Sequence, residues 1–342
     1  DYSHVDKYFL DFTIRNDASS RFGKNKRNGT FWATGLMWKA YNEDFLKDNV
    51  SWINRLNLKA SYGTQGNANV GNYTHLGKIS KLSTAYNGGY GIVLSSPSNE
   101  DITWENQSLL TIGVDTRLFD KVDVNLSYYD RRTTDMLMSV PQPYTSGFTS
   151  VSANVGAMRN NGIDLSLNFD ILNTRDASLS ARATFAYNNE KVTKLFNGLD
   201  RWEIANTFLA YVVGSPVYYY GPIYAGVDPE DGAPMWYLPA EETKTVIDPV
   251  TGKETTEVTI LKDITTKDPS RVTKTYNEEQ LTQNTGIRRN EPINGGFGFT
   301  GRYKNLQVRA DFAYVLGKYL YNNDAYFYAN PVENVGKNQI KD

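Results

Sequence analysis

The stretch GIDLSLNFDILNTRDASLSARATFAYN, residues 162 to 188, decides the fold that we expect for this chain. Apolar and polar residues alternate through two runs, and a period of two is typical of a β-strand with one apolar face. The apolar face of the first run holds Ile163, Leu165, Leu167, Phe169 and Ile171. That of the second holds Leu179, Ala181, Ala183, Phe185 and Tyr187. Turn-forming residues 173–176 separate the runs, so the stretch predicts an antiparallel hairpin of a soluble sandwich or a membrane barrel.

Composition excludes several classes of function. The 342 residues carry a net charge of −2, which offers no basic surface for nucleic acid. There is no Cys, and the only histidines, His4 and His75, lie at neither metal-ligand nor catalytic spacing. The sequence therefore predicts neither an enzyme nor a metal centre. No apolar run is long enough for a transmembrane helix, and residues 1–4 are not a signal peptide, so we expect this sequence to begin within a longer chain.

Nine segments show the same alternation of apolar and polar residues. They cover about residues 8–15, 30–39, 55–65, 107–118, 122–128, 163–171, 179–187, 297–303 and 306–314. A short helix that Asn42 could cap is expected within residues 41–54. Long connections are expected at about residues 66–105, 133–161 and 190–292, and tight turns at Asp120, Thr174 and Asn305.

The alternation of long and short connections favours a transmembrane barrel over a sandwich, since outer-membrane barrels have short periplasmic turns and long external loops. Aromatic residues agree, because strands that lead to the long connections end their apolar faces in tyrosine. One expected interfacial girdle contains Tyr62, Tyr128, Tyr187 and Tyr314, and the opposite one contains Trp38 and Tyr303. The other face of each strand carries Asn, Ser, Thr, Gly, Asp and Arg, which suits a wet lumen or a packed plug. We therefore predict an all-β, antiparallel transmembrane β-barrel, partial, with about nine strands.

Four segments resemble the SusC/RagA class of TonB-dependent outer-membrane transporters. They are FTIRNDASSRFGKNKRNGTFWATGLMWKAYNEDFL (residues 12–46), WINRLNLKASYGTQGN (52–67), YGPIYAGVDPEDGAPMWY (220–237) and INGGFGFTGRYKNL (293–306). The resemblance implies that residues 1–342 form a middle-to-late part of a larger, 22-stranded barrel. The plug domain and the C-terminal strands of the family have no counterpart in this sequence.

The resemblance also implies a function in the outer membrane of a Gram-negative bacterium. That function is active import of oligosaccharides, or of oligopeptides, with a SusD-like surface lipoprotein as a lid. A TonB–ExbB–ExbD complex would supply the energy through an N-terminal part that this sequence lacks. Two alternatives stay open at this point: a soluble or surface β-sandwich that binds carbohydrate, and a passive porin.

Three groups of residues are candidate sites. The first is an aromatic cluster that could contact substrate or lid, or pack its own loop: Tyr218, Tyr219, Tyr220, Tyr224, Trp236 and Tyr237. The second is a polar track in the lumen, whose members could guide substrate, or pair with one another or with a plug: Asp115, Arg117, Asp164, Arg182, Arg309 and Asp311. The third, Asp228, Glu230 and Asp231, resembles a Ca²⁺ loop, but it lacks a downstream bidentate acid, and Asp-Pro followed by Gly favours a simple turn.

Overall fold

The computed structural model describes residues 1–86, 89–204, 207–247 and 254–322, which form two compact units. The first unit contains residues 1–217 and 293–315, and the second contains residues 218–292 and the described residues from 316 onward. Within the described ranges, no helix combines the length and the apolar character that a membrane crossing requires.

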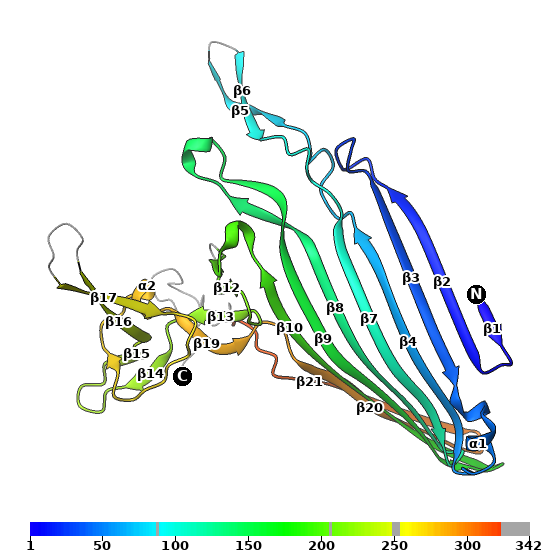
Figure 1. The fold of residues 1–342 in the computed structure, drawn as a ribbon. Coiled ribbons are helices and arrows are strands. Elements are labelled where there is room, and N and C mark those ends of the chain that lie inside the picture. Colours follow the sequence, from blue (N-terminus) through cyan, green and yellow to red (C-terminus); the bar gives the residue numbers. More distant parts are fainter. Residues whose placement is uncertain (87–88, 205–206, 248–253, 323–342) are drawn as a thin grey trace. The chain divides into compact units, whose positions relative to one another are not determined.

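The first unit is built on a ten-stranded antiparallel sheet (Figure 1). Its strands, in spatial order, are β1 (Tyr2–His4), β2 (Tyr8–Ala18), β3 (Asn28–Lys39), β4 (Ile53–Asn67), β7 (Glu105–Leu118), β8 (Val122–Pro141), β9 (Ser150–Asn173), β10 (Ala177–Lys194), β20 (Ile293–Tyr303) and β21 (Leu306–Leu316). The nine long strands confirm the nine predicted segments. The three residues of β1 are too few to show a periodic pattern, so this strand was not predicted.

The register places the predicted apolar positions on one face of the sheet, called here the apolar face. One cross-strand row of this face runs through Leu10, Leu36, Ala60, Ile112, Tyr128, Ile163 and Tyr187. These side chains are not packed into a core: Leu36 is 56% exposed and Ile112 is 51% exposed. A soluble sandwich would bury them, whereas a membrane barrel presents them to lipid. The exposed apolar face therefore supports the barrel.

The short connections follow local backbone chemistry. Phe119 and Asp120, between β7 and β8, both have positive φ, which tight hairpin turns use to match the twist of their strands.

Strands β3 and β4 are joined by η1 (Ala40–Asn42) and α1 (Asp44–Lys47). The expected cap is wrong in detail, because the N-cap of α1 is Glu43. The Asn42 side chain instead donates to the Asp6 carbonyl at 2.9 Å.

The long connections hold more structure than the sequence predicted. The connection 66–105 contains a hairpin of β5 (Lys78–Tyr86) and β6 (Gly89–Ser96). The expected loop at 133–161 is wrong for most of its length, because β8 and β9 stay paired as far as Pro141 and Ser150. A bulge between Thr133 and Met136 shifts the register, and this shift breaks the alternation by which the strands would be recognised. Only residues 142–149, with η2 (Tyr144–Ser146), connect the two strands.

The long connection expected at 190–292 also contains short strands and helices. After β10 and η3 (Phe196–Gly198), the first unit contains β11 (Arg201–Glu203) and β12 (Leu209–Val212). The second unit contains β13 (Tyr218–Gly221), β14 (Tyr224–Val227), β15 (Pro234–Tyr237), β16 (Ala240–Ile247), β17 (Glu254–Leu261), β18 (Val272–Thr273), α2 (Glu278–Leu281) and β19 (Gln283–Arg288). These elements have two to eight residues, which is too short for periodicity to reveal them.

Two small cores stabilise the long-connection end of the first unit. One consists of Phe22, Phe31, Val70, Ile102 and Trp104, which come from three connections and from β3. The other consists of Val192, Leu195 and Val217. Burial of these side chains fixes the connections onto the sheet, at roughly 1.5–3 kcal/mol for each large side chain.

Candidate functional site

The polar face of the sheet, opposite the apolar face, is the first candidate site. Alternate positions of neighbouring strands align on it, so that one cross-strand row contains Arg55, Arg117, Asp123, Asn168 and Arg182. Side chains directly opposite each other on one face lie about 5 Å apart, which is close enough for charges to pair. The row therefore aligns charged side chains of β4, β7, β8 and β10, with the neutral Asn168 of β9 between the last two.

Two members of the predicted polar track, Asp115 and Arg117, belong to an ionic network on this face. The network joins three cations, Arg55, Lys59 and Arg117, to three carboxylates, Asp115, Asp123 and Asp170. Arg55 contacts Asp115 at 2.9 Å and Asp123 at 2.8 Å. Arg117 contacts Asp123 at 2.5 Å and Asp170 at 2.9 Å. Formal charges cancel within the network, so it offers hydrogen-bonding groups without a net charge.

Three further members of the track come together on the same face, near the edge of the sheet that β10, β20 and β21 form. Asp311 of β21 pairs with Arg182 of β10 and, at 2.7 Å, with Arg309. Strand β20 lies between β10 and β21, and its Gly298 is the residue opposite Arg182. A Cβ at position 298 would come within 3.3 Å of the Arg182 Nε and would overlap Asp311. Glycine is therefore what allows Arg182 to cross β20 and reach the carboxylate.

Asp164, the last member of the track, is an exposed residue apart from both networks. It lines a hollow of about 230 Å³ together with Asn125, Ser166, Thr184 and Asn294. In the part of the chain that the structure describes, no cation pairs with Asp164. The arrangement can accept hydrogen bonds from hydroxyl or amide groups of a solute.

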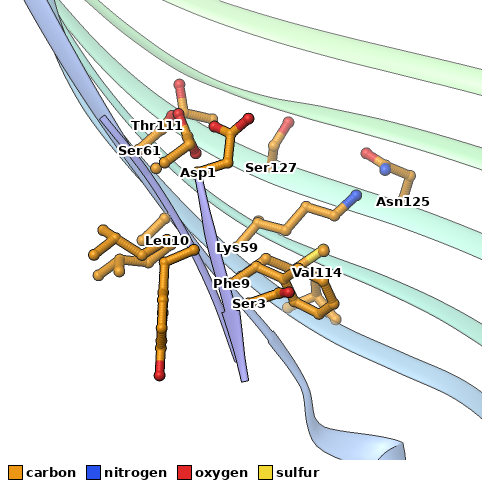
Figure 2. Close-up of a pocket in the computed structure, with 17 residues that line it drawn as sticks. Asp1, Ser3, Phe9, Leu10, Lys59, Ser61, Thr111, Val114, Asn125 and Ser127 are labelled. Atoms are coloured by element: carbon orange, nitrogen blue, oxygen red, sulfur yellow. The ribbon is translucent and has the colours of Figure 1, made fainter. Parts of the chain in front are cut away.

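A larger hollow, of about 780 Å³, lies over β1–β4, β7 and β8 (Figure 2). Its lining combines hydroxyl and amide groups of Ser61, Thr111, Ser127 and Asn125 with the ring of Phe9. Figure 2 shows Lys59 extending across the hollow toward Asn125. A wall of this kind can hydrogen-bond a polar solute and also contact an apolar ring or side chain.

The predicted aromatic cluster lies in the second unit, and most of its members pack within that unit. Tyr220 of β13 is 5% exposed, and its hydroxyl donates to Asp263 at 3.0 Å. Tyr224 and Trp236 are paired across β14 and β15. The Trp236 ring meets Tyr276 edge-on at 5.1 Å. Tyr218, Tyr219 and Tyr237 are half-buried, whereas Tyr224 is 58% exposed. Only Tyr224 therefore presents most of its ring to a partner or solute.

The Asp228–Asp231 segment forms a turn, as favoured from sequence. The Gly232 amide donates to the Asp228 carbonyl at 2.8 Å, and Gly232 has a φ of +72°. The Lys274 ammonium contacts Asp228 at 2.5 Å and Asp231 at 3.0 Å, so it neutralises the two carboxylates that a Ca²⁺ ion would otherwise bind. Among the described residues, no three His, Cys, Asp or Glu side chains are grouped to hold a metal ion.

Sequence reasoning missed four members of the ionic network, namely Arg55, Lys59, Asp123 and Asp170. Each occupies a polar position of a predicted strand or of its end, so the alternation of apolar and polar residues could have placed it on the polar face. Their ion pairs could not be predicted, because the pattern of a single strand does not reveal its register with neighbouring strands.

Comparison with known proteins agrees with this architecture. The family "TonB dependent receptor-like, beta-barrel" matches residues 1–239. TonB-dependent receptor P3 of Formosa agariphila is 33% identical over 202 residues, which are 58% of this chain and 20% of that protein. TonB-dependent receptor SusC of Bacteroides thetaiotaomicron is 31% identical over 207 residues, again 58% of this chain and 20% of that protein. The solved RagAB peptide transporter is 36% identical, with a TM-score of 0.81 over 95% of this chain and 33% of that chain.

The chain therefore belongs to the TonB-dependent receptor β-barrel family, whose members lie in the outer membrane of Gram-negative bacteria. Within the family it is a SusC/RagA-like barrel segment, as the four quoted segments indicated. It spans about a fifth of the length of these curated relatives and a third of the solved transporter chain.

Proposed function

We propose that this segment is part of a barrel that imports a large polar solute, an oligosaccharide or an oligopeptide, with energy supplied through TonB. The observation that carries the proposal is the similarity to the RagAB peptide transporter over 95% of the chain, at a TM-score of 0.81. The polar face supports it, because five of the six members of the predicted polar track are paired within networks and the hollows of the face offer hydroxyl, amide and carboxylate groups.

The transport proposal predicts the result of an uptake experiment in the bacterium that carries this gene. Labelled oligosaccharides and a labelled peptide mixture are supplied to wild-type cells, to cells lacking the gene and to cells lacking TonB. We expect uptake of one solute class to be lost in both mutants. Uptake that needs the gene but continues without TonB would indicate a passive porin, and uptake that persists without the gene would exclude the proposed import.

A surface lipoprotein that covers the external end is the second part of the proposal, and the β5–β6 hairpin supports it. Ile79 is 69% exposed, Ile92 is 70% exposed and Tyr90 is 58% exposed. Large apolar side chains gathered on one external hairpin are typical of a protein interface. We assign a lid contact to this hairpin, and Tyr224, the exposed member of the predicted aromatic cluster, stays a separate candidate contact.

The partner contact is tested by purification of the barrel from detergent-solubilised outer membranes. Wild-type protein should carry a lipid-anchored protein in equal amount, and Ile79→Ser with Ile92→Ser should release it. The matched control is Val258→Ser with Ile264→Ser, which removes apolar side chains that are 57% and 50% exposed in the second unit. Equal retention of the lipoprotein by both double variants would contradict the assignment.

A further inference from the structure

Three basic residues form an uninterrupted row across β8, β9 and β10. Arg132 lies directly opposite Arg159, and Arg159 lies directly opposite Lys191. Like charges placed opposite each other on one face of a sheet repel and destabilise it. A row of this kind therefore needs negative charge close by.

The protein supplies only part of that charge. Arg159 holds Asp130 through two hydrogen bonds of 2.9 and 2.8 Å, and Arg132 reaches the same carboxylate at 3.2 Å. The Asp130 side chain is 10% exposed, whereas those of Arg132 and Arg159 are 62% and 40% exposed. No carboxylate in the described residues pairs with Lys191, which is exposed. Three cations against one carboxylate leave two positive charges.

The row belongs to the apolar face, because its members share parity with residues of the tyrosine girdle. Arg132 lies four positions beyond Tyr128, and Lys191 lies four positions beyond Tyr187, both toward the long connections. Four residues extend about 13 Å along a strand, or about 10 Å along the membrane normal at the usual tilt. A long basic side chain can bend back several ångströms from there, which brings its charge to the lipid headgroups.

At the same height, β7 and β4 carry no charge on this face. The row continues from Arg132 through Ser108 of β7 to Thr64 of β4. Along this row, the positive charge is therefore confined to β8–β10.

We infer that Arg132, Arg159 and Lys191 bind the phosphate groups of an anionic lipid in the outer leaflet of the outer membrane. Arginine presents a planar fork that matches phosphate oxygens, and lysine adds a point charge. Asp130 is a positioning residue, because it orients Arg159 and Arg132 and leaves their other donors for the lipid. The inference rests on the outer-membrane location of the family and not on the proposed import.

The test measures how much lipid A, a bisphosphorylated glycolipid, stays bound to the full-length transporter in detergent, by native mass spectrometry. The variant is Arg132→Gln with Lys191→Gln, which keeps the Asp130–Arg159 pair. The matched control is Arg131→Gln with Lys24→Gln. Arg131 occupies the adjacent position on the polar face, and both doubles remove two charges. Strand content by circular dichroism verifies that both variants are folded.

Wild type and control should retain lipid A, and the variant should bind it at least about tenfold more weakly, since each cation near the surface contributes about 1 kcal/mol. Dephosphorylated lipid A should bind wild type as weakly as lipid A binds the variant. Equal binding of lipid A by the two double variants would overturn the inference. It would also be overturned if inorganic phosphate alone displaced the lipid at micromolar concentration, because the site would then be one for free phosphate.

Discussion

The Tyr8 hydroxyl donates a 2.6 Å hydrogen bond to Oε1 of Glu43, which lies 35 residues further along the chain. The same carboxylate accepts hydrogen bonds from the Lys7 ammonium at 2.9 Å and from the Trp38 indole at 3.1 Å. Tyr8 and Trp38 are also stacked, with ring centroids 6.5 Å apart. Glu43 thus joins the start of β2 to the connection between β3 and β4, at the end of the sheet where the turns are short.

This relationship predicts a response to acid. Hydrogen bonds from Tyr8, Lys7 and Trp38 lower the pKa of Glu43 from 4.5 to about 2. Because the pKa is lower in the folded state, the stabilisation is present above about pH 4.5 and is lost as the pH falls through 2. We expect hydrogen exchange at the Asp48 amide, corrected for intrinsic rates, to accelerate over this range. In Glu43→Gln the exchange should be independent of pH, and a pH dependence equal to that of wild type would contradict the assignment.

The strand register predicts different penalties on the two faces of the sheet. Leu126 and Leu165 face each other on the apolar face, and Asn125 and Ser166 face each other on the polar face. Leu126→Arg or Leu165→Arg should cost roughly 2–4 kcal/mol, because the charge must enter lipid. Asn125→Arg and Ser166→Arg should cost much less. Urea unfolding in micelles measures the difference, and equal costs on both faces would show that the register is wrong.

A side chain added at position 295 should destabilise the fold, because groups of two neighbouring strands pass close to Gly295. The Tyr314 hydroxyl passes over Gly295 and donates to the Thr184 carbonyl at 3.0 Å. A Cβ at position 295 would overlap both groups, so Gly295→Ala should destabilise the fold by about 1–3 kcal/mol. Gly301→Ala is the control, since its Cβ would meet Leu179 only at 3.8 Å. Thermal unfolding of the two variants distinguishes them, and equal melting temperatures would contradict the predicted contact.

Removal of the Lys274 charge should change the pKa of Asp228 more than that of Asp231. The Lys274 hydrogen bond is the main cause that lowers the pKa of Asp228, whereas the Ala233 amide is the main cause for Asp231. Lys274→Gln should therefore move the pKa of Asp228 further back toward 3.8 than that of Asp231. Both carboxylates stabilise the turn above their unfolded pKa and lose this effect as the pH falls. Carbon-13 titration of the side chains measures both values, and equal shifts would contradict the assignment.

Sequence reasoning located the polar track but did not settle what its members do. Parity along each strand placed Asp115, Arg117, Arg182 and Asp311 on the polar face. The choice between a free track and paired charges depends on which strands are neighbours, and strand order brings Arg182 and Asp311 together across 129 residues. The aromatic cluster shows the same limit, because burial of Tyr220 depends on Asp263 and on β19, neither of which follows from the spacing of tyrosines.

The sequence by itself determined the nine long strands, their apolar faces and most of their short turns, because alternation and turn chemistry are local properties of the chain. Only the tertiary structure decided what depends on pairing between strands. It extended β8 as far as Pro141, past a bulge, and β9 back to Ser150, and it paired five of the six members of the predicted polar track. It also aligned Arg132, Arg159 and Lys191, which lie 27 and 32 residues apart in sequence, in one row. Register sets these contacts, and register is a property of neighbouring strands and not of any one of them.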